Sequence, residues 1–138
     1  MKNIFNTNLP GNSGHVALLV FRVLVAIFML THGFPKLQRL LSGEEIQFAN
    51  PYGLGVTVSF VLVIFAEFFC SILVILGLAT RLAVIPLMIT MATAVIFAHA
   101  DDPFGTKEKP LLFLLIFGLL LVFGPGHYSI DRSIGKRR

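Results

Sequence analysis

Four stretches of the chain are almost entirely apolar, and short polar segments separate them. They cover residues 14–34, 56–79, 82–100 and 106–123. An α-helix rises about 1.5 Å per residue, so helices of these lengths reach across a hydrocarbon core of roughly 30 Å, the shortest with snorkelling ends. The pattern predicts an all-α integral membrane protein, an antiparallel four-helix bundle that forms one domain over residues 1–138.

The segment between the first two apolar stretches has a different pattern. Lys36 and Arg39 alternate there with three leucines at helical spacing, and Gly43 and an Asn50-Pro51 turn signal follow. Such alternation is typical of an amphipathic helix at the membrane surface. We therefore expect a short interfacial helix between the first and second spanning helices. The leucines are Leu37, Leu40 and Leu41.

Composition agrees with a membrane protein and excludes an ordinary soluble domain. Hydrophobic residues make up 56% of the chain and charged residues 13%, whereas soluble domains carry roughly 25% charged residues. The net charge of +4 does not indicate a nucleic-acid partner, because the excess Lys and Arg lie near the chain ends. The expected partner is the lipid bilayer.

The distribution of basic residues predicts the orientation. Four spans place both termini and the turn after the second span on one side, with six basic residues against four on the other. Positive charge favours the cytoplasmic side. We therefore expect a multi-pass protein of the cytoplasmic (inner) membrane with both termini in the cytoplasm. The six are Lys2, Arg81, Arg132, Lys136, Arg137 and Arg138, and the four are Lys36, Arg39, Lys107 and Lys109.

Glu67 lies near the middle of the second apolar stretch, where a carboxylate needs a partner or a task. Arg22 lies about 12 Å from the cytoplasmic end of the first stretch and Glu67 about 16 Å from the outer end of the second, so the two fall at similar depth. We expect an Arg22–Glu67 ion pair. It either fixes the two helices against each other or belongs to a pocket that binds or relays a proton.

Two histidines end the first and third apolar stretches on the same side of the membrane. His32 and His99 are near Lys36, and either cap their helices or face a shared pocket. Two imidazoles in a pocket could ligate a metal or haem iron, or bind a quinone. No Cys/His metal motif is present, and Cys70 is the only cysteine, which excludes a Cys-x-x-Cys pair. The candidate pocket comprises Arg22, His32, Lys36, Glu67 and His99.

Arg81 and Asp131 are expected at the cytoplasmic turns. Arg81 follows the second span directly, and Asp131 follows the Gly124-Pro125-Gly126 stop after the fourth. A salt bridge between them would tie the C-terminal tail to the turn between the second and third spans. We expect this pair to be structural, since surface pairs rarely carry chemistry.

Several of these motifs together resemble the DoxX family of small integral membrane proteins. The resemblance rests on Thr31-His32-Gly33 with Lys36, on Glu67 and His99, and on two turns, 76–81 and 124–131. It implies a four-helix membrane fold. The family is similar to subunits of sulfur-metabolising membrane oxidoreductases that pass electrons to quinone, and some relatives are linked to oxidative-stress complexes.

Three function classes follow from these observations. The first is a membrane subunit of a redox system whose outward-facing pocket binds a quinone or a small sulfur compound, with other subunits as partners. The second is a proton-linked transporter of small molecules that uses Arg22 and Glu67. The third is a non-catalytic scaffold or assembly factor in which the buried charges specify packing. Neither the cofactor nor catalytic activity follows from the residues alone.

Overall fold

The computed structural model describes residues 11–136, and this range is helical without any β-strand. The all-α prediction is therefore confirmed. Lys2, Arg137 and Arg138, which entered the prediction of orientation, lie outside the described residues. The elements are α1 (Ser13–Ser42), α2 (Val56–Ile64), the π-helical segment η1 (Phe65–Cys70), α3 (Ser71–Leu76), α4 (Thr80–Thr93), the π-helical segment η2 (Ala94–Ala98), α5 (Phe104–Phe123) and α6 (Ile130–Gly135).

α1 is longer than the first apolar stretch. It runs for 30 residues and includes residues 34–42, which were expected to begin a separate interfacial helix. That expectation is wrong, because Pro35 removes one helical hydrogen bond without ending the helix, and the residues after it are good helix formers. The first residue that ends the helix is Gly43, whose φ of 73° is left-handed. Residues 44–50 then form an irregular connection.

The second long rod consists of α2, η1 and α3, which follow one another without a break. It ends at Gly77, where φ is 66°. A Cβ at Gly77 would lie 2.6 Å from the Ser129 Cβ and 2.8 Å from an Arg22 guanidinium nitrogen. Only glycine therefore fits at this point, both for the left-handed turn and for the close approach of the C-terminal segment.

Three of the described helical rods are long and apolar enough to cross a membrane: Ser13–Ser42, Val56–Leu76 and Thr80–Ala98. α5 has 20 residues but carries Lys107, Glu108 and Lys109 in its first two turns. Large apolar side chains cover the outside of all these rods, with Phe21 63%, Leu82 70% and Leu115 66% exposed. Such a surface suits contact with lipid rather than water.

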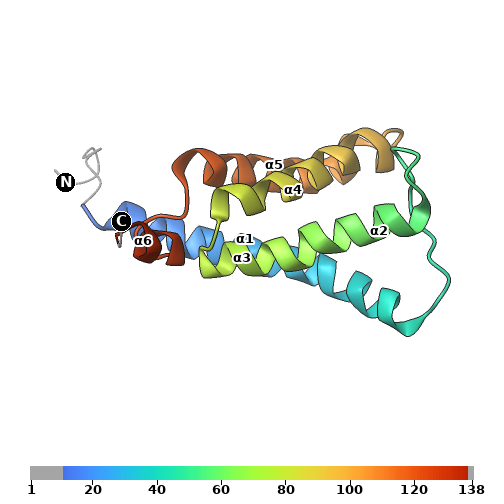
Figure 1. Ribbon diagram of the computed structural model, residues 1–138. Helices are drawn as coiled ribbons and strands as arrows, with labels where there is room; N and C mark the ends of the chain where they lie inside the picture. The colour runs from blue at the N-terminus through green and yellow to red at the C-terminus, as the bar shows by residue number, and fades with distance from the viewer. Residues whose placement is uncertain (1–10, 137–138) are drawn as a thin grey trace.

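The rods alternate in direction, and both ends of the described chain lie at one end of the molecule, where α6 packs (Figure 1). α1 packs mainly against η1 and α3, while α5 packs mainly against α4. Small side chains such as Ala26, Ala66 and Ala83 are buried in the core between the rods and allow them to approach closely. The remaining core residues are Val25, Met29, Cys70, Val74, Val84, Leu87, Met91, Phe117 and Leu120.

Candidate functional site

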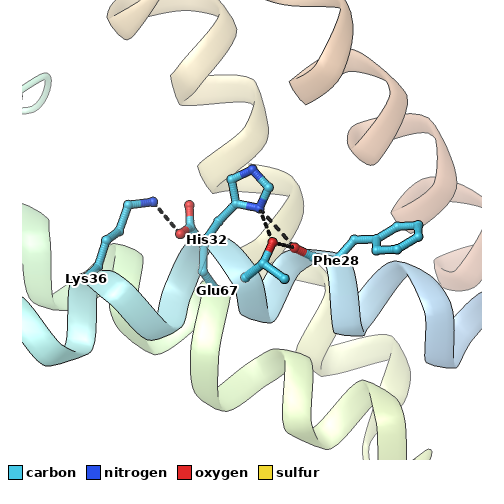
Figure 2. Close-up of polar contacts among 5 residues, drawn as sticks. Phe28, His32, Lys36 and Glu67 are labelled. Atoms are coloured by element: carbon cyan, nitrogen blue, oxygen red, sulfur yellow. Dashed lines mark hydrogen bonds and ion pairs between the residues drawn. The ribbon is translucent and has the colours of Figure 1, made fainter.

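Glu67 forms an ion pair with Lys36, across the contact between α1 and η1 (Figure 2). The Lys36 ammonium donates to Glu67 Oε2. The carboxylate side chain is 5% exposed and the lysine side chain 28% exposed, so the pair lies at the edge of the protein interior. A charge pair in such a position is retained for a structural or a functional reason, because removal of water from both charges is costly.

Gly33 makes this pairing possible. A Cβ at Gly33 would lie 2.7 Å from the Glu67 carbonyl carbon and 2.8 Å from its oxygen. These are backbone atoms, so a side chain at this position would force the two rods apart. The contact fixes the axial register of α1 against η1 and places Lys36, three residues further along α1, within reach of Glu67.

Gly33→Ala is expected to destabilise the protein by roughly 1–3 kcal/mol, because one extra methyl group must be inserted into a closely packed contact. Thermal unfolding in detergent, followed by circular dichroism, measures this. The matched control is Gly14→Ala in the same helix, where a Cβ would meet nothing within 4 Å. The control is expected to be neutral or slightly stabilising. Equal unfolding temperatures for the two variants would contradict a tight contact at Gly33.

The Nδ1 atoms of both predicted histidines have acceptors within their own segments. His32 Nδ1 lies 2.9 Å from the Phe28 carbonyl oxygen, and His99 Nδ1 lies 2.6 Å from Asp102 Oδ2. A carbonyl or carboxylate oxygen only accepts, so Nδ1 carries the hydrogen in each ring. In a neutral imidazole the remaining nitrogen, Nε2, is then a hydrogen-bond acceptor. Figure 2 shows His32 turned along α1 toward Phe28.

Two cavities meet at the ion pair. The larger, about 270 Å³, is mainly apolar and includes Tyr52, Thr93 and Phe97 in its lining. The smaller, about 170 Å³, is lined by His32, Met29, Met91, Lys109 and Phe113 among others. The residues common to both are Lys36, Glu67, Ala94 and His99. The structure therefore brings together four of the five residues predicted for the pocket.

Both π-helical segments adjoin this cluster. Glu67 lies within η1, and η2 ends directly before His99, whose N–H donates to the Ala94 carbonyl five residues earlier at 2.9 Å. A π-helical turn is wider than an α-helical turn and is frequent at functional sites. In this chain the two wide turns face the same pair of cavities, and hydropathy gives no signal for either turn.

Arg22 is not part of this cluster, so the predicted Arg22–Glu67 ion pair is wrong. The guanidinium group is buried and donates to three backbone carbonyl oxygens, those of Pro125, Tyr128 at 2.8 Å and Ile75 at 3.4 Å. These acceptors lie at the C-terminal end of α3 and in the loop after α5. Arg22 therefore binds the C-terminal segment to the core, at the opposite end from the cavities.

The salt bridge predicted between Arg81 and Asp131 is also not formed. Asp131 accepts from the backbone N–H groups of Ala79, at 2.6 Å, and Thr80, at 3.0 Å. Arg81 donates instead to the Val122 carbonyl oxygen at 3.1 Å. Asp131 does hold the C-terminal segment at the turn between α3 and α4, but it does so by capping the first turn of α4.

Sequence reasoning missed the aromatic lining of the larger cavity. The Tyr52 hydroxyl group lies 2.6 Å from Thr93 Oγ1, and the Tyr52 ring packs on Phe97 with 5.5 Å between centroids. The loop before α2 thereby closes over the end of α4 and η2. The sequence held one indication, a tyrosine directly after the Asn50-Pro51 turn, but no spacing links it to residues 93–97.

The family model named DoxX matches residues 17–100, which is more than half of the chain. This range includes all four residues that line both cavities. The chain belongs to the DoxX family. The predicted resemblance is thus confirmed. The matched range ends one residue after His99, so α5 and α6 lie outside it.

Curated relatives extend the similarity over most of the chain. Inner membrane protein YphA of Escherichia coli (strain K12) is 30% identical over 132 residues, which is 88% of this chain and 93% of YphA. Inner membrane protein YqjF of the same strain is 33% identical over 128 residues, 88% of this chain and 95% of YqjF. "Putative oxidoreductase CatD" of Bacillus subtilis (strain 168) is 30% identical over 125 residues, 90% of this chain and 91% of CatD.

No solved structure matches the chain. The family and its relatives, together with three helices able to span a membrane, make this DoxX-family member a membrane-embedded, multi-pass protein. The bilayer is therefore its immediate environment, as the composition predicted.

Proposed function

We propose that this DoxX-family protein is the quinone-binding membrane subunit of a redox system and that the Lys36–Glu67 pair forms the polar end of its site. The observation that carries this proposal is the position of the pair. It lies where a mainly apolar cavity of about 270 Å³ meets a smaller cavity that contains His32. A ligand with a polar ring and an apolar tail fits this arrangement.

The hydrogen-bonding groups suit both states of a quinone. The Lys36 ammonium group is a donor that a quinone carbonyl oxygen can accept from. In the neutral form of each ring, Nε2 of His32 and of His99 is an acceptor, to which the hydroxyl group of a quinol can donate. Because the donor and the acceptors line connected cavities, the same site serves the oxidised and the reduced ligand.

The larger cavity also lies beside lipid-facing side chains. Leu54, Leu62, Ile89 and Phe97 line it and are each about half exposed on the outer surface of the protein. A quinone reaches such a site from within the bilayer and leaves its isoprenoid tail among these side chains. A small sulfur compound, by contrast, would use only the polar end.

The electrons would come from a partner subunit. The chain has a single cysteine, Cys70, so it has no dithiol of its own, and Cys70 is buried. The name of one relative, "Putative oxidoreductase CatD", is in line with a redox role. We assign ligand binding to this chain and electron supply to a redox partner that docks beside it.

For the topology we propose four spans, with α5 as the fourth and both termini cytoplasmic. The first charged residues of α5 would then lie in the headgroup region, with their long side chains extended toward water. The cavities would face the outside, because they lie at the end opposite α6. Cysteine labelling at Asn12 and Gly135 in a Cys70-free background tests this, and labelling from outside at either position would reverse it.

Quinone retention tests the site. Protein purified in mild detergent is extracted with solvent, and the extract is analysed for quinone, while visible absorption reports haem. His32→Ala and His99→Ala are each expected to lower retained quinone by about tenfold, the effect of one lost hydrogen bond in a dry site. Gln38→Ala, an exposed position on the same helix as His32, serves as the control.

Two other outcomes would support different functions. Tracer uptake or proton flux in proteoliposomes, lost in Glu67→Gln, would support a proton-linked transporter. A folded protein with neither quinone nor transport, but with a partner that copurifies equally with wild type and both histidine variants, would support a scaffold. If His32→Ala and His99→Ala retain as much quinone as the wild type, the pocket is not the quinone site.

A further inference from the structure

A third cavity lies at the other end of the molecule and uses none of the residues of the proposed quinone site. It measures about 770 Å³ and opens between the start of α4, the loop after α5, α6 and the first turns of α1. Figure 1 shows α6 at this end, beside α1 and α3. The polar side chains that matter here are Arg81, Arg132, Lys136, His15 and His127, all of which line the cavity.

The side chains that line this cavity carry a net positive charge. Arg81, Arg132 and Lys136 form no ion pair among residues 11–136, where the two ion pairs are Lys36–Glu67 and His99–Asp102. Asp131 is the one acid in the lining, and both of its oxygens already accept from the backbone of Ala79 and Thr80. Three cations therefore share the lining with one carboxylate, and this excess of positive charge favours an anionic ligand.

Two histidines form part of the wall. The rings of His15 and His127 stack with 3.4 Å between centroids and 14° between planes. Loss of water around the stacked ring, and then the positive charge of Arg132, lower the pKa of His127. The lowered pKa favours the neutral form of His127, while Arg81, Arg132 and Lys136 contribute positive charge. His15 Nδ1 is buried without a hydrogen-bond partner.

Apolar side chains border the same cavity. Leu82 is 70% exposed and Phe123 65% exposed, and both line the cavity. The cavity lies where α3 ends and α4 begins, which is the level of the lipid headgroups for helices that span a bilayer. Basic groups beside an apolar rim match an amphiphile with a phosphate head.

We propose that this cavity binds the phosphate group of an anionic phospholipid, with Arg132 and Lys136 as its main ligands and the acyl chains against Leu82 and Phe123. Arg132 lies on α6, and Lys136, four positions later, directly follows the last residue of that helix; both line the cavity. Arg81 approaches from α4 and keeps one guanidinium nitrogen on the Val122 carbonyl oxygen. A free phosphate ion would use the same ligands without the apolar contacts.

Native mass spectrometry of the full chain in detergent tests the proposal, with phosphatidylglycerol and phosphatidylcholine as probes. The wild type is expected to bind phosphatidylglycerol at least tenfold more tightly than phosphatidylcholine. The variant R132Q/K136Q is expected to bind phosphatidylglycerol about 10- to 30-fold more weakly than wild type, from the contribution of two basic residues near the headgroup. The control R39Q/K107Q removes two charges at the opposite end, where both donate to loop carbonyl oxygens.

The outcomes separate the possible ligands. If millimolar inorganic phosphate displaces phosphatidylglycerol from the wild type but has no such effect on R132Q/K136Q, the cavity is a phosphate site. Its ligand would then be a soluble phosphate compound and not a phospholipid. Equal affinity of the wild type for the two lipids, or equal weakening in both double variants, would overturn the proposal. Quinone retention is unaffected in either case, so this test stands apart from that of the proposed function.

Discussion

Arg22→Ala is expected to lower the free energy of unfolding by roughly 3–6 kcal/mol, the largest effect of any single substitution considered. Arg22 is 1% exposed, and its guanidinium group donates to the carbonyl oxygens of Pro125 and Tyr128, with a longer contact to Ile75. A hydrogen bond to a charged donor contributes about 1.5–3 kcal/mol, and each abandoned buried acceptor adds a desolvation penalty. Alanine removes the donors and leaves a cavity as well.

The measurement is thermal and denaturant-induced unfolding in detergent, followed by circular dichroism. Arg39→Ala is the matched control, because Arg39 is on the same helix and donates to one loop carbonyl oxygen, that of Glu45, at 3.1 Å. The control should change stability by less than about 1 kcal/mol. Arg22→Lys keeps the charge without the planar fork and is expected to recover less than half of the loss.

A local readout accompanies the global one. Loss of Arg22 releases the loop at Pro125 and Tyr128, so protease cleavage near residues 124–129 should become faster in Arg22→Ala than in Arg39→Ala. If Arg22→Ala unfolds like wild type and is cleaved no faster, Arg22 does not hold the C-terminal segment, and its burial needs another explanation.

The sequence predicted the apolar rods well because membrane solvation imposes long uninterrupted runs. Three of the four predicted runs coincide with helices able to span a bilayer. The end of α1 was predicted wrongly. Pro35 and the basic residues after it indicate an interruption, yet Gly43 is the first position that changes the direction of the chain. Proline within a helix removes one bond, whereas a left-handed residue ends it.

The register between the first two rods could not be predicted from hydropathy. Depths counted from the ends of the apolar stretches placed Arg22 level with Glu67. In the structure Gly33 is opposite Glu67, and Arg22 lies 11 residues earlier, about 16 Å away along the axis. A single small residue decides this register through a backbone contact. An apolar run has no sharp end, so its boundary cannot fix a position to within a helical turn.

Four of the five residues predicted for the candidate site do come together, but the partner of Glu67 was predicted wrongly. His32 and Lys36 are four residues apart, a spacing that places both on one face if α1 continues through Pro35. The prediction ended the first span at residue 34, so Lys36 was assigned to another element, and Arg22 was predicted to be the partner of Glu67. The π-helical turns at Glu67 and before His99 depend on packing between rods, so no local sequence pattern predicts them.

Lys36→Met is expected to destabilise the protein by roughly 3–5 kcal/mol, because it leaves the Glu67 carboxylate, 5% exposed, without its cation. Glu67→Gln should cost less, about 1–2 kcal/mol, since the Lys36 side chain is 28% exposed and its ammonium group can turn toward water. The double variant Lys36→Met/Glu67→Gln removes both charges and is expected to unfold within about 1 kcal/mol of wild type.

The double variant separates packing from ligand binding. If the pair only holds α1 against η1, the double variant should keep stability and every other property, including any retained quinone. If the pair is the polar end of a quinone site, the double variant should fold and yet lose the quinone, because no ammonium donor remains at the junction of the two cavities. Extraction of the two single variants and the double variant, with Glu44→Gln as an exposed acidic control, gives the comparison. A double variant that is as stable as wild type and retains as much quinone would assign Lys36 and Glu67 to helix packing alone.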